Sequence, residues 1–348
     1  MLKIGKIKIS KTEKPKIIAE ISGNHNRNIN RALKLIRLAA KHGADFVKIQ
    51  TYTPENLTIN SSRSDFIIRD KKSLWNKKKL FDLYKIGQTP LSWHKKLIRE
   101  AKKSRIVLFS SVFDEYSLKF LEKLNMPAYK IASFESNHYP LIEKVIKTRK
   151  PILISTVFNT LKETNELVKF LKKKKCKNFA LLKCTSSYPA DPNDANILTI
   201  NDMRKRFRCE IGLSDHTLGI GTSISAINHG ATFIEKHFTL DNKDGGIDSK
   251  FSLNPIKLKD LIEETYNAWQ SVGKIFYGPT KNEINSLKFR RSIYSTKNIK
   301  KGEKFTDQNI KVVRPGYGLK PKFYNNILGK ISKIKISTGT AINWKMIK

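Results

Sequence analysis

The 348-residue chain is 39% hydrophobic and carries a formal net charge of +38, so it can bury one large core with a smaller domain beside it. No apolar run reaches the ~18 residues of a membrane span, so we expect no membrane partner. The lysines are spread along the chain without a basic tail or nucleic-acid motif, so we expect no nucleic-acid partner, but a positive field that attracts an anionic substrate. Cys176, Cys184 and Cys209 form no CxxC pair, which indicates free thiols in a reducing compartment, and we expect a cytoplasmic protein.

Eight short runs rich in Ile, Val and Phe predict β-strands. They span 17–22, 46–51, 107–112, 128–133, 151–156, 179–185, 210–216 and 233–240. Amphipathic segments between them, such as INRALKLIRLAAKHGA (29–44) and PLIEKVIKTRK (140–150), predict helices because apolar residues recur at three- and four-residue spacing. Strands that alternate with helices indicate a parallel sheet, and eight of them in about 250 residues predict a (β/α)8 barrel.

The main rival fold is a doubly wound open sheet, which would need a glycine-rich phosphate loop. Neither AEISGNHN (19–26) nor GIGTS (219–223) has the GxGxxG pattern. The longest connection, 52–106, holds LWNKKKLFDLYK (74–85), which predicts a helical insertion at the mouth of the barrel. After about residue 280 the pattern changes to short strand-like pieces and charged turns, so we expect a barrel domain over 1–280 and a small domain over 281–348.

Every predicted strand ends in polar residues that a purely structural core would not need. They are Glu20, Lys48, Gln50, Ser110, Ser111, Lys130, Ser133, Ser155, Thr156, Lys183, Thr185, Ser186, Ser214, Asp215, His216, Glu235 and His237. Because the active site of such a barrel lies at the C-terminal ends of the strands, we expect these side chains to converge on one pocket. A lone strand-end serine is more often a turn former, and a lone buried lysine could simply pair with a glutamate. Coincidence at all eight strands would be unexpected.

The residue types in this ring suit two kinds of ligand. Lysines with several hydroxyls bind a small, multiply charged anion such as a phosphate or carboxylate. Two neutral imidazoles from neighbouring strands, His216 and His237, could hold a divalent cation, although either histidine alone would be read as a core or turn residue. Glu20 could act as a general acid or base. Schiff-base chemistry through Lys130 or Lys183 stays open, whereas no GxSxG elbow supports a serine nucleophile.

Several motifs together resemble the bacterial nonulosonic (sialic) acid synthase family. They are AEISGNHN (19–26), KIQTYTP (48–54), YKIASFE (129–135), KCTSSYP (183–189), GLSDHTLGI (212–220), IEKHFTLD (234–241), FRRSIY (289–294) and RPGYGL (314–319), in this order. Residues 73–94 and GGIDSKFSL (245–253) resemble the pseudaminic acid branch more than the N-acetylneuraminate branch. The resemblance implies a TIM barrel followed by an antifreeze-like (SAF) domain, and a homodimer in which each SAF domain covers the partner's barrel.

The resemblance also implies a reaction. Phosphoenolpyruvate would condense with 2,4-diacetamido-2,4,6-trideoxy-L-altrose and water to give pseudaminic acid and phosphate, with cleavage of a C–O bond. Such products serve flagellin glycosylation or surface polysaccharides. The alternatives within the family are an N-acetylneuraminate or a legionaminic acid synthase. Outside it, the alternative is a nucleic-acid-binding protein on an inactive barrel.

Residue roles carry over from the resemblance motif by motif. His216 and His237 match the ligands of Mn2+ or Mg2+, and Glu20 matches the carboxylate that handles protons. The phosphoenolpyruvate site would consist of Lys48, Ser111, Lys130, Ser133, Ser155 and Ser214. The sugar site would consist of Gln50, Tyr188, Glu235 and Asp248, with Arg314 reaching an N-acetyl group from the other subunit. Val157 departs from the family, which usually has glycine after the Ser-Thr pair at 155–156.

Overall fold

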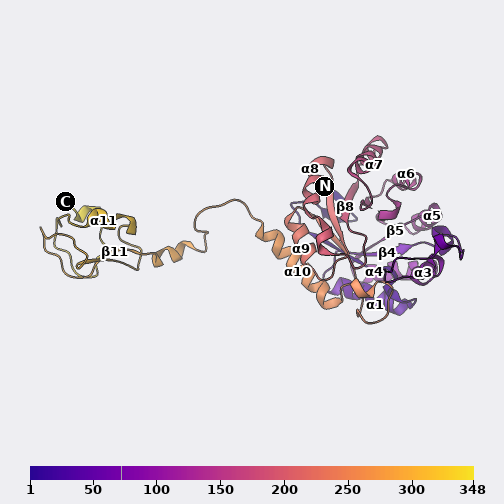
Figure 1. Cartoon of the computed structure of the whole chain (residues 1–348), viewed down its shortest axis with the longest axis horizontal. Coiled ribbons are helices and arrows are strands. Elements are labelled where there is room, and N and C mark those ends of the chain that lie inside the picture. Colours follow the sequence, from indigo (N-terminus) through magenta and orange to yellow (C-terminus); the bar gives the residue numbers. More distant parts are fainter. Residues whose placement is uncertain (72) are drawn as a thin grey trace. The chain divides into compact units, whose positions relative to one another are not determined.

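The computed structural model describes residues 1–71 and 73–348, which form two compact units, Met1–Gly273 and Lys274–Lys348 (Figure 1). The second unit begins at Lys274, shortly before residue 281, where the sequence predicts the start of the small domain. No helix among these described residues is long and apolar enough to cross a membrane.

A closed barrel of eight parallel strands forms the centre of the first unit, which confirms the predicted fold class. The strands are β3 (Lys16–Glu20), β4 (Phe46–Thr51), β5 (Val107–Val112), β6 (Tyr129–Ile131), β7 (Ile152–Ser155), β8 (Phe179–Cys184), β9 (Glu210–Asp215) and β10 (Phe233–His237). Each strand pairs with the next in chain order, and β10 closes the barrel against β3 with His237 opposite Glu20. This register brings the two ends of the barrel sequence together at its C-terminal rim.

Helices surround the strands in Figure 1 and cover the outside of the barrel. They are α1 (Ile29–Lys41), α4 (His94–Lys103), α5 (Glu115–Lys123), α6 (Tyr139–Lys147), α7 (Leu161–Lys173), α8 (Leu198–Phe207), α9 (Gly221–Asn228) and α10 (Pro255–Ser271). Polar side chains cap several of their first turns: Asn28 accepts from the amide of Arg31, and Thr160 forms a capping box with Glu163. The apolar helix faces pack on the outward side chains of the strands in one continuous core.

Large side chains fill the barrel near the N-terminal ends of its strands, and an amino-terminal hairpin closes that end. Strands β1 (Leu2–Ile4) and β2 (Ile7–Ile9) are antiparallel and pack Leu2, Ile4 and Ile9 into the same cluster as the barrel residues Phe109 and Phe233. Gly212 is required there, because a Cβ at that position would lie 2.5 Å from the ring of Phe233. Because side chains fill the N-terminal end of the barrel, the space for a site lies at the C-terminal rim.

The predicted insertion between β4 and β5 contains four short helices before α4. They are α2 (Pro54–Leu57), η2 (Ser64–Phe66), α3 (Leu80–Gly87) and η3 (Leu91–Trp93). Only the second half of the segment predicted as helix, from Leu80 onward, is helical. The indole of Trp75 donates to the carbonyl of Ile247 at 3.3 Å, so the insertion contacts the loop that follows β10.

The C-terminal unit has its own small core. It contains η7 (Ile284–Phe289), the antiparallel strands β11 (Ser292–Ser295) and β12 (Ile310–Val313), η8 (Pro321–Phe323), α11 (Tyr324–Ile327) and η9 (Trp344–Met346). Its buried apolar residues are Ile293, Ile299, Phe305, Ile310, Ile327, Ile336, Ile342 and Ile347. Short strands around an isoleucine-rich core agree with the change of sequence pattern after residue 280.

Candidate active site

A cavity at the C-terminal rim of the barrel gathers most of the side chains that the sequence predicts for the site. Its lining includes Lys48, Gln50, Ser111, Lys130, Ser133, Ser155, Tyr188, Ser214, His216, Glu235 and His237. Ala132, Phe134 and Cys184 also line it. The polar ring therefore comes from strands spread around the barrel, as expected for an active site at the strand ends.

Not every polar strand-end residue reaches this cavity. Ser110 bonds the hydroxyl of Thr51 at 2.6 Å, Lys183 donates to the carbonyl of Cys184 at 2.9 Å, and Asp215 pairs with Lys236. None of the three lines the cavity, so the prediction that all these residues converge is wrong for them. The reason is the alternation of side chains along a strand, which sends neighbours of inward residues to the outer face. Schiff-base chemistry at Lys183 loses its support with this orientation.

Two buried lysines meet one carboxylate at the centre of the site. The Nζ atoms of Lys48 and Lys130 lie 3.5 and 3.4 Å from Oε1 of Glu235. Each lysine also donates to a serine, Lys48 to Ser111 at 2.9 Å and Lys130 to Ser155 at 2.8 Å. The three charged side chains are at most 6% exposed, so this is a buried cluster in which two ammonium groups and two hydroxyl groups line the same cavity.

Glu20 extends the cluster towards the barrel mouth. Its Oε2 lies 2.7 Å from the ammonium of Lys48, and its Oε1 accepts from Nε2 of Gln50 at 3.1 Å. Burial raises the pKa of Glu20, and Lys48 only partly offsets this. Burial would also raise the pKa of Glu235, but Lys130 and Lys48 outweigh it and hold that pKa below its usual value. The pKa values of the two carboxyl groups are therefore shifted in opposite directions, which makes Glu20 the better proton acceptor.

The two histidines face each other at the same rim, with ring centroids 5.3 Å apart. Nδ1 of His216 lies 2.7 Å from the carbonyl oxygen of Thr185; because a carbonyl only accepts, Nδ1 carries a proton, and Nε2 is the nitrogen left to bind an ion. Burial would lower the pKa of His216, but Cys184 and the carbonyl of Thr185 outweigh it and raise that pKa. Burial, reinforced by His216 and the nearby lysines, lowers the pKa of His237 well below its usual value, so this ring is neutral. Its buried Nδ1 has no hydrogen-bond partner among the residues that the structure describes.

This pair fits a divalent cation with an incomplete protein shell. Two imidazoles on adjacent strands, one oriented by a carbonyl and the other with an unpaired nitrogen, are suitable donors for such an ion. Because metal ligands must be deprotonated, the ion would have to displace a proton from His216, whose pKa is raised. Within residues 1–71 and 73–348, no group of three or more His, Cys, Asp or Glu side chains is arranged to hold a metal. Water and substrate oxygens would therefore have to supply the other ligands, which is typical of a catalytic rather than a structural site.

Asp248 reaches the histidine pair from the loop after β10. Its Oδ2 lies 3.7 Å from Nδ1 of His237 and accepts from the amide of Gly23 at 3.4 Å. Burial raises the pKa of this carboxyl. Asp248 and Glu20 do not line the cavity itself but stand beside it, next to His237 and Lys48 respectively.

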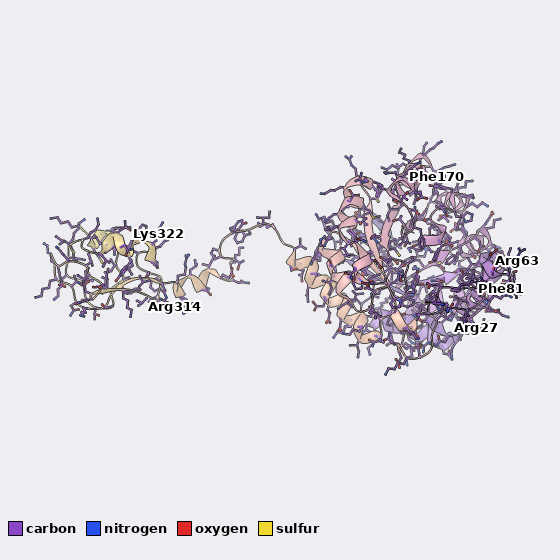
Figure 2. The ribbon with its side chains drawn as sticks, in the orientation of Figure 1. Arg27, Arg63, Phe81, Phe170, Arg314 and Lys322 are labelled. Carbon is purple, nitrogen blue, oxygen red and sulfur yellow. The ribbon has the colours of Figure 1, made fainter. Side chains whose placement is uncertain are left out.

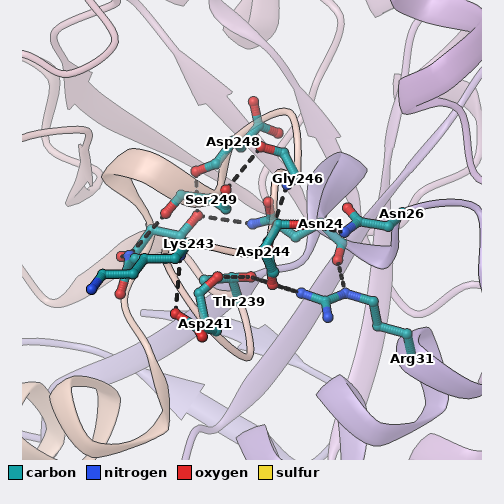
Figure 3. Close-up of polar contacts among 12 residues, drawn as sticks. Asn24, Asn26, Arg31, Thr239, Asp241, Lys243, Asp244, Gly246, Asp248 and Ser249 are labelled. Atoms are coloured by element: carbon teal, nitrogen blue, oxygen red, sulfur yellow. Dashed lines mark hydrogen bonds and ion pairs between the residues drawn. The ribbon is translucent and has the colours of Figure 1, made fainter.

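A polar network ties the Asp248 loop to the segment after β3 (Figure 3). The guanidinium of Arg31 binds the carboxylate of Asp244 and also donates to the carbonyl of Asn24 at 2.6 Å. Nδ2 of Asn24 donates to the carbonyl of Phe238 at 3.0 Å and to the hydroxyl of Ser252 at 2.8 Å. These bonds fix a loop that the sequence alone does not connect to α1, and they hold it against the residue that follows His237.

Four residues at the site were not predicted: Ala132, Phe134 and Cys184, which line the cavity, and Phe251 beside it. Cys184 lies 3.8 Å from Nδ1 of His216; burial alone would raise its pKa, but His216 and then Lys130 outweigh it and lower the pKa to about 7. Phe251 packs its ring 5.0 Å from that of His237, and Phe134 lines the cavity although it is 66% exposed. Ala180 and Leu182 face the barrel interior. Because side chains alternate along a strand, this pattern would have predicted that Cys184 also faces inward.

Arg314 lies in the C-terminal unit, directly after β12, and its side chain is exposed (Figure 2). Its contribution to a sugar site stays a prediction.

Comparisons with known proteins identify the family of the chain. The NeuB family matches residues 35–277 and the SAF domain matches residues 290–348. A pseudaminic acid synthase of Campylobacter jejuni is 41% identical over 94% of both chains, and an N,N'-diacetyllegionaminic acid synthase of the same species is 36% identical over 92% of this chain and 96% of the relative. The solved N-acetylneuraminic acid synthetase of Leptospira borgpetersenii is 29% identical, with a TM-score of 0.73 over 83% of this chain and 95% of its own. The chain belongs to the NeuB family, with a SAF domain at its C-terminal end.

Proposed function

We propose that this protein is a pseudaminic acid synthase that condenses phosphoenolpyruvate with 2,4-diacetamido-2,4,6-trideoxy-L-altrose and water. The observation that carries the proposal is the meeting of Lys48 and Lys130 at Glu235 within 3.5 Å, with the histidine pair lining the same cavity. Such a cluster recognises a small, multiply charged anion beside a divalent cation. The 41% identity to a pseudaminic acid synthase over nearly the whole chain supports the choice of sugar.

The reaction forms one carbon–carbon bond and one carbon–oxygen bond to water, and it breaks the carbon–oxygen bond to phosphate. C3 of phosphoenolpyruvate attacks C1 of the open-chain sugar, positive charge develops at C2, and water adds there. The tetrahedral C2 then expels phosphate. His216 and His237 would hold a divalent cation, Mn2+ or Mg2+, which would supply polarisation of the sugar aldehyde.

The protein side chains have distinct tasks in this scheme. Lys48 and Lys130, with the hydroxyls of Ser111, Ser133, Ser155 and Ser214, would bind the phosphate and carboxylate of phosphoenolpyruvate. Glu20, whose pKa is raised by burial, would take the proton that water loses at C2 and return it to the former aldehyde oxygen. Gln50, Tyr188, Glu235 and Asp248 would orient the sugar, which sets the distance between the reacting carbons.

The C-terminal unit has a proposed role in a homodimer. Each SAF domain would cover the barrel of the partner, and Arg314 would bind an N-acetyl group of the sugar held there. The exposure of Arg314 in a unit that is compact by itself supports this assignment.

A panel of three sugars tests the proposal most directly. Purified protein with phosphoenolpyruvate and Mn2+ is given the altrose-derived sugar, the legionaminic acid precursor or N-acetylmannosamine, and the products are identified by mass spectrometry. We expect phosphate release and a pseudaminic acid mass with the first sugar only. Turnover of the legionaminic precursor alone would favour the second candidate, to which the 36% identical relative points. No turnover with any sugar, together with salt-dependent DNA binding, would instead favour the nucleic-acid reading.

A further inference from the structure

An ion pair lies on the outer face of the barrel, directly behind the two histidines. Asp215 precedes His216, Lys236 precedes His237, and Asp215 and Lys236 are register partners on the adjacent strands β9 and β10. Because side chains alternate along a strand, this pair points out of the barrel while the histidines point in. Each member of the pair is therefore one peptide bond from one histidine.

The pair is buried, and the carboxylate of Asp215 accepts four hydrogen bonds. Nζ of Lys236 lies 2.8 Å from Oδ2 of Asp215, and the two side chains are 0% and 1% exposed. The same ammonium donates to the carbonyl of Thr217 at 2.8 Å. Asp215 also accepts from the hydroxyl of Ser223 at 2.6 Å and from the amide and hydroxyl of Thr217 at 2.8 and 2.7 Å.

These contacts fix the backbone on both sides of His216. The carboxylate holds Thr217, the residue after His216, and Ser223 at the start of α9, while Lys236 connects the same turn to β10. The carbonyl of His216 accepts from the amide of Ala190 at 3.0 Å, so the peptide that carries this histidine is held from a third strand-end loop as well. The positions of the two imidazoles relative to each other thus depend on one ionic network.

Stability alone does not account for such a pair. Replacing a buried ion pair by apolar residues of similar volume is often neutral or stabilising, because desolvating two charges offsets their attraction. The outward side chains two positions before each member of the pair, Leu213 and Ile234, belong to the apolar core around the barrel. A leucine–methionine pair would fill this space, but it could not bind the amide and the carbonyl of Thr217.

We propose that Asp215 and Lys236 are positioning residues that hold His216 and His237 at the separation needed to bind one divalent cation. The inference rests on the proposed function, because it assigns these residues to the metal affinity of that site. Groups that orient metal ligands without touching the ion commonly account for about 10- to 100-fold of metal affinity.

The test separates metal affinity from stability. The double variant Asp215→Leu/Lys236→Met is compared with wild type by urea unfolding and by titration with Mn2+ alone in a calorimeter. We expect an unchanged or higher unfolding midpoint and an Mn2+ affinity at least about tenfold weaker. Lys236→Arg, which keeps the charge and the donors, should bind Mn2+ within about threefold of wild type. The matched control is Lys16→Met/Asp45→Leu, an ion pair of 3.6 Å at the opposite end of β3, which should leave Mn2+ affinity unchanged.

The outcomes distinguish this inference from the proposed function. If the folded double variant binds Mn2+ as tightly as wild type, the positioning role is wrong while the function stands. If wild type itself binds no divalent cation, the metal-dependent function fails first. Should the double variant not fold, Asp215→Asn keeps the shape and removes the charge; wild-type Mn2+ affinity in that variant would equally overturn the inference.

Discussion

Glu235→Gln removes the one carboxylate that faces both buried lysines while preserving its size. At an effective dielectric of about 20, each pairing at 3.4–3.5 Å amounts to a gross attraction of about 5 kcal/mol, most of which offsets the desolvation of the charges. Leaving buried charge uncompensated typically destabilises by about 3–5 kcal/mol. Lys48 keeps Glu20 as a partner, whereas Lys130 keeps only the hydroxyl of Ser155, so the loss is concentrated at Lys130. For a unit of this size the melting temperature should fall by about 10 °C.

An added anion should reverse this loss, because phosphate or phosphoenolpyruvate would supply the missing negative charge. The assay is the melting temperature with and without 10 mM phosphate, for which we expect a larger upward shift in the variant than in wild type. Glu143→Gln, which removes a surface partner of Lys174, is the control and should change neither value appreciably. A variant as stable as wild type, with the same response to phosphate, would refute the proposal that Lys48 and Lys130 form an anion-binding site.

Three further predictions address other parts of the molecule. Arg31→Gln should loosen the loop that carries Asp248 and raise the KM for the sugar by about tenfold without changing the KM for phosphoenolpyruvate. Arg37→Gln on the same helix is the control. Equal effects of Arg31→Gln on both KM values would contradict a specific role of this loop in sugar binding. Burial raises the pKa of Glu135 to about 7, above its ordinary 4.5, so the folded protein should lose stability as pH rises from about 4.5 to 7. Glu135→Gln should therefore gain up to about 3 kcal/mol over wild type at pH 8 and almost nothing at pH 4.5 in urea unfolding, and parallel pH profiles would refute this. Co-expressed Arg314→Ala and His237→Ala chains should recover about a quarter of wild-type activity if Arg314 acts across a dimer, because half of the randomly formed dimers contain one intact site; no recovery would exclude that role.

The sequence was sufficient for the barrel because hydrophobic runs, helix caps and spacing all agree there. Strands β4 and β5 begin and end at the predicted residues, and the other six differ only at their ends. The amino-terminal hairpin was overlooked although Leu2, Ile4, Ile7 and Ile9 alternate with lysines around a Gly-Lys turn, the period of a half-buried strand pair. Three-residue strands in a basic segment give too weak a signal unless the open end of the barrel is considered.

The site could be predicted as a set of residue types but not as a geometry. The alternation of side chains along each strand would have predicted that Ser214 and His216 face inward and Asp215 outward. It would also have placed Cys184 in the cavity. This alternation cannot bring Asp248 to His237, because that approach depends on Asn24 and Arg31, more than 200 positions away in the sequence. Contacts of this range come from the folded loops and have no local sequence pattern.

The central claim is that His216 and His237 support a metal-dependent condensation. The most direct measurement is the rate of phosphate release from phosphoenolpyruvate with the altrose-derived sugar, after treatment with EDTA and again after addition of Mn2+. We expect EDTA to abolish release, Mn2+ to restore it in wild type, and His237→Ala to remain inactive at the same Mn2+ concentration. Release at the wild-type rate in EDTA, or from His237→Ala, would contradict this claim.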